Sequence, residues 1–246
     1  MNKKLFSIKN FVAIITGSGR GIGLEIAISF FKCGAKVIRI DSNLQKNKKY
    51  KFEDFEIDLT KKKLLEQTIN KIEKKHRRID VLINNAGVTL SGNNPYDEKI
   101  LKDTLSVNLV VAYNLSNQVC KIMSKRKKGS IINITSLAAE TGFENNPSYQ
   151  VSKAGLKQLS KALACDWGHK NIRINNICSG YIKTSMTKKS YKNPLLKKNR
   201  DTRMILNRWG EPKDIVGPCV FLASDSSSYI TGSDIIVDGG WLAKGL

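Results

Sequence analysis

The sequence contains no long uninterrupted apolar run. No stretch reaches the roughly 18 consecutive apolar residues that a membrane-spanning helix needs, although 41% of the 246 residues are hydrophobic. The first apolar stretch, FVAIIT at 11–16, is short and leads into glycines instead of a small-residue cleavage site, which argues against a secretory signal peptide. We therefore expect a cytoplasmic globular protein that does not associate with membranes.

Residues that build metal sites and nucleophilic triads are also scarce. Only two histidines occur, His76 and His169, whereas a serine hydrolase needs a histidine base beside its nucleophile. The cysteines are scattered without CxxC spacing, and four of them lie in apolar surroundings, which predicts reduced, buried thiols with no disulfide framework and no metal site. They are Cys33, Cys120, Cys165, Cys178 and Cys219.

Acidic residues are few compared with basic ones. The 42 lysines and arginines against 21 aspartates and glutamates give a net charge of +21. Such a charge indicates either nucleic-acid binding or a lysine-rich solvated surface. We favour the surface and expect no nucleic-acid partner, because lysines outnumber arginines 33 to 9 and the runs at 61–63 and 125–128 contain no aromatic residue. A positive field also suits an anionic small-molecule substrate.

What the sequence does contain is an alternation of β-rich runs with helical stretches. Continuous apolar strands separated by helices of more than about ten residues indicate a parallel sheet covered on both faces, with ligands at the carboxyl ends of the strands. No repeat, linker or break in composition occurs, so we expect one domain over 1–246, with Gly34 ending the first helix. Strands are expected at 12–16, 36–41, 80–87, 130–136, 172–180 and 234–240, and helices at 21–34, about 61–76, 98–125, 148–168 and 212–223.

The stretch TGSGRGIG at 16–23 follows the first expected strand and opens the first helix. It is not a P-loop, because no GK[ST] follows, and Ile22 occupies the position of the third glycine of GxGxxG. Instead, Gly17 allows a tight turn, Gly21 lets the backbone approach a pyrophosphate at the helix N-terminus, and Gly23 lets the helix pack closely on the sheet. The stretch predicts a dinucleotide-binding turn, with an ordinary flexible loop as the alternative.

Asp41 ends the second expected strand and lies 18 residues after Gly23. This is close to the roughly 20-residue offset at which an acidic residue accepts hydrogen bonds from the adenosine ribose hydroxyls. A carboxylate there repels a 2′-phosphate and favours NAD, whereas Arg20 in the glycine turn favours NADP. We weigh Asp41 more heavily and expect NAD, with NADP and a simple turn aspartate as the alternatives.

Tyr149 and Lys153, in SYQVSK, are four residues apart and share one face of an expected helix. An ammonium beside a phenol lowers the phenol pKa from its usual value of about 10, which produces a general acid and base for carbinol–carbonyl chemistry. Ser136, at the carboxyl end of SIINITS, is placed to hydrogen-bond the same oxygen. An amphipathic helix and a polar strand end are the structural alternatives.

Together these residues resemble the short-chain dehydrogenase/reductases over essentially the whole chain. The matching motifs are TGSGRGIG, Asp58 in DLT, NNAG at 84–87, Asn108 in SVNL, Ser136, and Tyr149 with Lys153. The resemblance implies a single-domain α/β Rossmann fold, with a seven-stranded parallel sheet of order 3-2-1-4-5-6-7 and helices on both faces. It also implies hydride transfer between a nicotinamide and a secondary alcohol or ketone, usually in a homotetramer.

The resemblance further implies a role for each matching residue. Tyr149 would exchange a proton with the substrate oxygen, while Lys153 would bind the nicotinamide ribose and lower the pKa of the tyrosine. Ser136 would polarise the carbonyl, and Asn108 would hold a water in a proton relay. Cofactor contacts are also expected from Thr16, Gly17, Ser18, Arg20, Gly21, Ile22, Gly23, Asp41, Asp58, Leu59, Asn85, Ala86, Gly87, Ile182 and Thr184.

One position departs from the family pattern. Ser179-Gly180 stands where the family usually has Pro-Gly. Losing the proline frees one φ angle and should loosen the loop over the nicotinamide slightly.

The substrate is expected to contact the segment 185–207, where this fold places its lid. The tail from 208 onward resembles gluconate 5-dehydrogenases, but 3-oxoacyl-acyl-carrier-protein reductases share FLASD and YITG with it. The lid is rich in lysine and arginine, which suits an anionic substrate. Its apolar residues, Met186, Leu195, Leu196, Met204, Ile205 and Leu206, are expected to pack inward rather than to line an acyl groove.

We therefore expect a dehydrogenase of gluconate-like sugar acids. The 3-oxoacyl-acyl-carrier-protein reductase is the alternative, and a non-catalytic nucleotide-sensing Rossmann protein is the more distant one.

Overall fold

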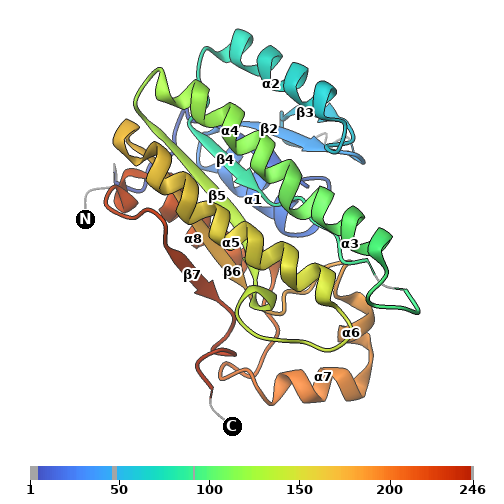
Figure 1. Ribbon diagram of the computed structural model, residues 1–246. Coiled ribbons are helices and arrows are strands. Elements are labelled where there is room, and N and C mark those ends of the chain that lie inside the picture. The colour runs from blue at the N-terminus through green and yellow to red at the C-terminus, as the bar shows by residue number, and fades with distance from the viewer. Residues whose placement is uncertain (1–4, 46–48, 91, 245–246) are drawn as a thin grey trace.

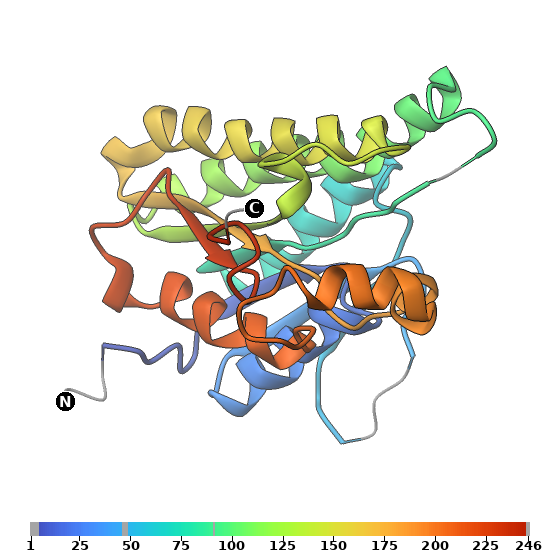
Figure 2. The ribbon, with the colours of Figure 1, turned by 90° about the horizontal axis from the view of Figure 1, so that it is seen from below.

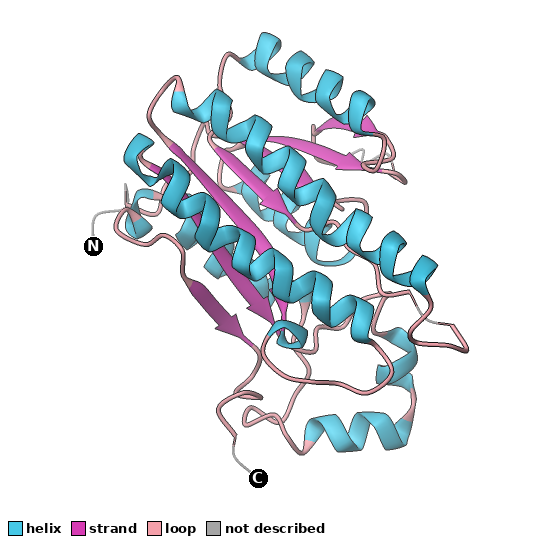
Figure 3. Ribbon diagram, viewed as in Figure 1, coloured by secondary structure: helices cyan, strands magenta, loops and turns pink. Residues whose placement is uncertain are grey.

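The computed structural model describes residues 5–45, 49–90 and 92–244. Its strands form one parallel sheet in the order β3-β2-β1-β4-β5-β6-β7, which confirms the expected topology (Figure 1, Figure 3). The strands are β1 Val12–Thr16, β2 Lys36–Asp41, β3 Glu53–Glu56, β4 Val81–Asn84, β5 Gly129–Ser136, β6 Ile172–Ser179 and β7 Asp234–Val237.

Helices cover both faces of this sheet. Figure 2 shows α2, α4 and α5 in one layer, the sheet in the middle, and α1 and α8 in the opposite layer. The expected helices are therefore present, and Gly34, with φ +83°, follows the end of the first one as expected. Their bounds are α1 Gly21–Lys32, α2 Lys62–His76, α3 Glu98–Leu105, α4 Val111–Ser124, α5 Pro147–Trp167, α6 Lys188–Lys192, α7 Pro194–Asp201 and α8 Pro212–Ala223.

Strand β1 shows why its sequence is continuously apolar. All five of its residues are buried, with Ile14 packing in the cluster beneath α2, α4 and α5, and Ile15 packing in the cluster beneath α1 and α8. Successive side chains of a strand point to opposite faces, so a strand covered on both sides favours apolar residues on both faces, as at Val12, Ala13, Ile14 and Ile15. Each such side chain contributes about 1.5–3 kcal/mol of hydrophobic free energy.

Strand β3 was not among the strands expected from the residue pattern. Its sequence, EDFE, is half-exposed and acidic, and it lies at the edge of the sheet, paired with β2 from Ile38↔Glu53 to Asp41↔Glu56. Glu53 accepts hydrogen bonds from Lys75 and His76 at the end of α2, each over 2.8 Å. Tertiary contacts therefore hold a strand that has little strand propensity of its own.

Two further expectations need correction. The helix expected at 98–125 contains a five-residue π-helical turn, Ser106–Val110, between α3 and α4. All five cysteines are free thiols, but only three are buried, because Cys33 and Cys165 are exposed. Among the described residues, no helix is long and apolar enough to span a membrane.

Candidate active site

The glycine turn between β1 and α1 packs directly against the turn that follows β4. Gly17 and Gly21 have φ values of +62° and +57°, a conformation that L side chains rarely adopt. A Cβ on Gly17 would lie 2.7 Å from the Cα of Ala86, and a Cβ on Gly23 would lie 2.2 Å from the carbonyl oxygen of Gly17. Gly17 and Gly23 are therefore needed for this close packing, and the positive φ of Gly17 agrees with the tight turn that the sequence predicted.

Hydrogen bonds from Thr16 and Asn85 fasten the two turns together. The Asn85 amide donates to the carbonyl oxygens of Thr16 and Gly17 over 3.0 and 2.8 Å. The Thr16 hydroxyl accepts hydrogen bonds from the backbone N–H groups of Asn85 and Ala86. The side chains of Thr16 and Asn85 thus shape the backbone of the expected dinucleotide site.

Asp41 lies beside the glycine turn. Its carboxylate accepts the backbone N–H of Gly19 over 2.8 Å and that of Asn43 over 3.0 Å. A Cβ on Gly19 would lie 2.2 Å from the carbonyl oxygen of Asn43, so only glycine fits there. Sequence reasoning assigned no role to Gly19, although it is visible as the second of the four glycines in TGSGRGIG.

Ser136, Tyr149 and Lys153 meet at the carboxyl end of β5. Ser136 ends that strand, and its side chain hydrogen-bonds the phenol of Tyr149 on the first turns of α5. The ammonium of Lys153 donates to the carbonyl oxygen of Ile134 over 2.9 Å and lies 5.8 Å from the centre of the Tyr149 ring. The structure therefore brings together the three residues that the sequence assigned to proton transfer.

Burial dominates the electrostatics of this cluster. It raises the pKa of Tyr149 above its ordinary value, and the hydrogen bond with Ser136 only partly offsets that rise. Burial also lowers the pKa of Lys153 from 10.5 to about 8. The expected depression of the tyrosine pKa by Lys153 is thus not found here, because desolvation disfavours the charged form of both side chains.

Asn108 lies inside the π-helical turn and connects two parts of the site. Its Oδ1 accepts the Val88 N–H over 2.8 Å, and its Nδ2 donates to the Val88 carbonyl and to the Ser152 hydroxyl, each over 2.9 Å. Ser152 in turn donates to the carbonyl oxygen of Tyr149 over 2.7 Å. Ser152 is a positioning residue that sequence reasoning missed, because nothing in the local pattern signals a bond to Asn108.

Gly87 leaves a space between these groups and the glycine turn. A Cβ on Gly87 would lie 3.4 Å from both the Asn108 Oδ1 and the Lys153 Nζ. The space is therefore bordered by an amide oxygen and an ammonium, two groups that suit ribose hydroxyls. The residues present fit a nicotinamide nucleotide extending from the glycine turn to Tyr149.

The remaining residues that were expected to contact the cofactor differ in their burial and in their contacts. Thr184 contacts the glycine turn, since a Cβ on Gly21 would lie 3.4 Å from its methyl group, whereas Ser18 is fully buried and donates to the carbonyl of Ile15. Asp58 is exposed, and hydrogen bonds from Thr60 lower its pKa. Arg20 is exposed, while Ile22, Leu59 and Ile182 pack largely through their side chains.

Ser179 replaces the usual proline without leaving its side chain free. Its hydroxyl donates to the carbonyl oxygen of Thr135 over 3.1 Å, and the next residue, Gly180, donates its N–H to Val237. A Cβ on Gly180 would lie 2.6 Å from the Cα of Asp238. These contacts hold the start of the loop that was expected to be loosened.

The segment 185–207 forms α6 and α7 beside the carboxyl edge of the sheet (Figure 1). Its ends are joined, because Lys183 and Gly210 form a backbone hydrogen bond next to the bridge between Ile182 and Gly210. The expectation that its apolar residues pack inward is wrong for all but Met204, which is 1% exposed. The exposed ones are Met186, Leu195, Leu196, Ile205 and Leu206.

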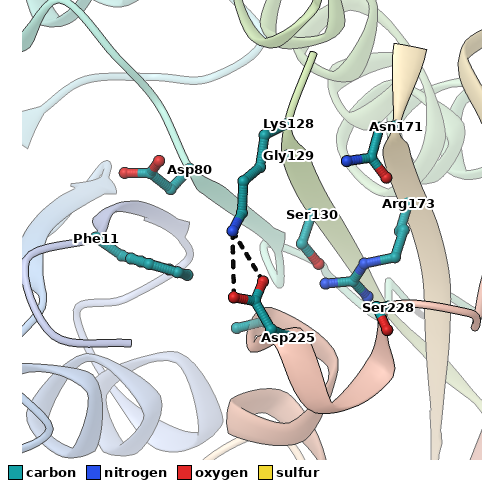
Figure 4. Close-up of a pocket in the computed structure, with 10 residues that line it drawn as sticks. Phe11, Asp80, Lys128, Gly129, Ser130, Asn171, Arg173, Asp225 and Ser228 are labelled. Carbon is teal, nitrogen blue, oxygen red and sulfur yellow. Dashed lines mark hydrogen bonds and ion pairs between the residues drawn. The ribbon is translucent and has the colours of Figure 1, made fainter. Parts of the chain in front are cut away.

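A separate small cavity of about 70 Å³ lies at the amino ends of the strands, away from this site (Figure 4). Lys128 and Asp225 form an ion pair across it at 2.9 Å, with the ring of Phe11 and the guanidinium of Arg173 on its walls. Asp80 and Ser130, at the starts of β4 and β5, also line it. It contains none of the expected site residues.

Comparison with known proteins identifies relatives along the whole chain. A family model described as enoyl-(acyl carrier protein) reductase matches residues 17–242. The 2-dehydro-3-deoxy-D-gluconate 5-dehydrogenase of Pseudoalteromonas atlantica is 33% identical over 97% of this chain and 98% of its own length. The 3-oxoacyl-[acyl-carrier-protein] reductase FabG of Thermotoga maritima is 35% identical over 93% of this chain and 96% of its own.

A solved structure agrees with these relatives. The gluconate 5-dehydrogenase of Burkholderia cenocepacia, in complex with NADP and tartrate, is similar with a TM-score of 0.93 and 27% sequence identity, over 98% of this chain and 99% of that chain. The family match extends through the glycine turn, the strand ends and the residues around Tyr149. The chain therefore belongs to the short-chain dehydrogenase/reductase family of NAD(P)-dependent oxidoreductases.

Proposed function

We propose that this protein interconverts a secondary alcohol and a ketone on a sugar acid such as gluconate or 5-ketogluconate. The observation that carries the reaction class is the cluster of Ser136, Tyr149 and the buried Lys153 beside the space at Gly87. The relatives that act on gluconate derivatives support the substrate class.

The chain's residues supply the proton transfer. A bound nicotinamide would accept or supply the hydride. Tyr149 transfers the proton at its phenolic oxygen, and Ser136 holds the substrate oxygen beside it by a hydrogen bond. Because burial raises the pKa of Tyr149, the phenol stays protonated at neutral pH, which is the form that reduces a ketone. Oxidation needs the phenolate and should therefore become faster as the pH rises.

Asn108 and Lys153 are the residues that we expect to bind the ribose at Gly87. The Lys153 Nζ and Asn108 Oδ1 border the space at Gly87, where they can bond the nicotinamide ribose and a relay water. The backbone of Gly17, Gly21 and the N-terminus of α1 would receive the pyrophosphate.

We expect NAD to be preferred over NADP. Asp41 is held against the glycine turn by the Gly19 N–H, which places a negative charge where a 2′-phosphate would lie. Arg20 is exposed and is the group that would accept NADP instead.

A second candidate function is the reduction of 3-oxoacyl groups on acyl carrier protein. The exposed apolar residues of 185–207 favour it, because an acyl chain needs an apolar surface. The net charge of +21 also suits an acidic carrier protein.

We further propose that the protein acts in the cytoplasm as a homo-oligomer and that the segment 185–207 is its substrate lid. A groove of about 460 Å³ on the outer face of α4 and α5 supports self-association. It is lined by Leu109, Val110, Tyr113, Gly155, Gln158, Leu159 and Ala162. Exposed aromatic and aliphatic side chains of this kind are typical of subunit interfaces.

The deciding experiment measures kcat/KM for 5-ketogluconate and for an acetoacetyl thioester, each with NADH and NADPH at equal ionic strength. We expect the sugar acid and NADH to give the higher values. A clear preference for the thioester assigns the protein to the second function, and a preference for NADPH contradicts the role of Asp41.

A further inference from the structure

Four aromatic side chains build a cluster beneath the segment 185–207. Tyr181 follows the end of β6 by two residues, and Ser179 at that end pairs in register with Ser136. The Tyr181 ring centre lies 5.2 Å from that of Trp209 and 4.9 Å from that of Trp241. Tyr191 contacts Trp209 from α6, with ring centres 5.7 Å apart. The cluster therefore lies next to the proposed reaction centre.

Arg200 places a cation on this cluster. Its guanidinium carbon lies 4.9 Å from the centre of the Tyr181 ring, and the residue is partly buried. The other cations of the segment have different positions. Lys197 pairs with Asp201, Arg203 is exposed beside Trp241, and the remaining cations are exposed lysines, namely Lys188, Lys189, Lys192 and Lys198.

Two N–H groups in this region are buried without a hydrogen-bond acceptor among the described residues. They are the Arg200 Nε and the Trp209 Nε1, both on side chains that contact Tyr181. The next residue, Asp201, pairs with Lys197 through its Oδ2, while its Oδ1 is also buried without a partner among the described residues. Buried polar groups in native proteins normally have partners, so these atoms are available to a bound ligand.

The chemistry of the missing partners matches a hydroxy acid. A carboxylate accepts the N–H groups of an arginine in a charge-assisted, often bidentate, arrangement. A sugar hydroxyl can donate to a carboxylate oxygen such as the Asp201 Oδ1. An acyl chain offers no such donor.

We propose that Arg200 binds the carboxylate of the substrate and so determines the preference for sugar acids. This inference rests on the proposed function. Closing the segment over the site removes water from the ion pair and strengthens it. Arg200 acts on binding and not on proton transfer, because Tyr149 and Ser136 hold the reacting oxygen.

The test compares gluconate with glucitol, a polyol of the same length that lacks the carboxylate. For Arg200→Gln, kcat/KM for gluconate should fall by about 10–100-fold, mostly through KM, which corresponds to losing one charged hydrogen bond. The value for glucitol should change less than about threefold. Arg200→Lys, which keeps the charge but not the fork, should recover part of the loss.

Arg203→Gln is the matched control, because Arg203 also contacts an aromatic ring, Trp241 at 5.0 Å, but is exposed. It should behave like the wild type with both substrates. Circular dichroism and the melting temperature of each variant report whether it folds, and Arg200→Lys preserves the test where Arg200→Gln does not fold.

The outcomes separate this inference from the proposed function. Equal losses with gluconate and glucitol, or no loss with either, overturn the role of Arg200 while leaving the sugar-acid activity in place. A wild-type protein that is inactive on gluconate and 5-ketogluconate overturns both.

Discussion

At the scale of single residues, the same burial acts in opposite directions on two neighbours. It raises the pKa of the Tyr149 phenol and lowers that of the Lys153 ammonium to about 8. Both shifts favour the neutral forms, since a low-dielectric surrounding disfavours charge of either sign. Tyr149 is therefore protonated at neutral pH and can donate its proton. A charged ligand that enters the site will shift the pKa values of both side chains.

Removing the Tyr149 hydroxyl tests the proton transfer. Tyr149→Phe keeps the ring and its packing, so the dissociation constant for the dinucleotide should stay within about twofold. Turnover should fall by at least the roughly 10²–10⁴-fold attributed to general acid–base catalysis. Steady-state kinetics and a fluorescence titration measure the two quantities, and wild-type turnover in this variant would falsify the assignment.

The shifted pKa of Lys153 predicts a pH-dependent stability. Its pKa is about 8 in the folded protein and near 10.5 in the unfolded chain, so between these pH values the unfolded chain binds more protons. The wild type therefore becomes more stable as the pH rises through this range, and Lys153→Met lacks this gain. The difference in unfolding free energy, wild type minus variant, should increase by about 1–3 kcal/mol between pH 7 and 10.5.

Denaturant titrations at several pH values measure this difference. Lys161→Met, which alters an exposed lysine on the same helix, is the control and should show no comparable trend. A difference for Lys153→Met that is independent of pH contradicts a buried amine with a lowered pKa.

At the scale of elements, the turn from β1 into α1 depends on contacts that only glycine permits. A Cβ on Gly23 would lie 2.2 Å from the Gly17 carbonyl oxygen and 2.4 Å from the Asn85 amide nitrogen. Both atoms belong to the hydrogen bond that fastens the turn to the segment after β4. The same contacts therefore determine both the shape of the proposed dinucleotide site and the packing of α1.

Gly23→Ala should therefore damage binding and stability together. We expect the dinucleotide affinity to fall at least about tenfold, and the unfolding free energy to fall by about 1–3 kcal/mol, as for other overpacked sites. Gly168→Ala is the control, because a Cβ there, at the end of α5 where the backbone is helical, meets nothing within 4 Å. It should be neutral or stabilising by up to about 1 kcal/mol. Gly23→Ala with unchanged affinity argues against this turn as the phosphate site.

At the scale of the whole molecule, the exposed apolar surface is uneven. Val110 and Tyr113 on the groove of α4 and α5 are 48% and 53% exposed. The basic residues, by contrast, are spread along the chain. An exposed apolar groove of this kind is typical of an interaction site, and it is the place that we propose for a second copy of the chain.

Introducing a charge into this groove should separate the subunits. Tyr113→Asp should lower the oligomeric state, because an unpaired carboxylate in a buried interface is costly. Leu64→Asp is the control, since Leu64 is 40% exposed on α2, outside the groove. Size-exclusion chromatography with light scattering measures the masses, and a monomeric wild type contradicts the proposed oligomer.

Much of the fold could be predicted from local patterns. The short strands β1, VAIIT, and β4, VLIN, are apolar at nearly every position because helices cover both faces, and β2, β5 and β6 were predicted from runs that mix apolar residues with polar ones. The acidic strand β3 could not be predicted from its residues, because its position depends on pairing with β2 and on hydrogen bonds from α2. The π-helical turn at Asn108 was hidden for a similar reason, since Val88 and Ser152 lie far from it along the chain.

The sequence by itself determined the reaction class of this protein, because the glycine turn, Asp41, Ser136, Tyr149 and Lys153 occur together in an order that resembles the short-chain dehydrogenase/reductases. Only the tertiary structure decided how these groups ionise, since desolvation depends on everything packed around them. It also decided the character of the segment 185–207. A helical spacing of apolar residues does not say which of them find partners, and here only Met204 is buried, while Arg200 is brought onto Tyr181.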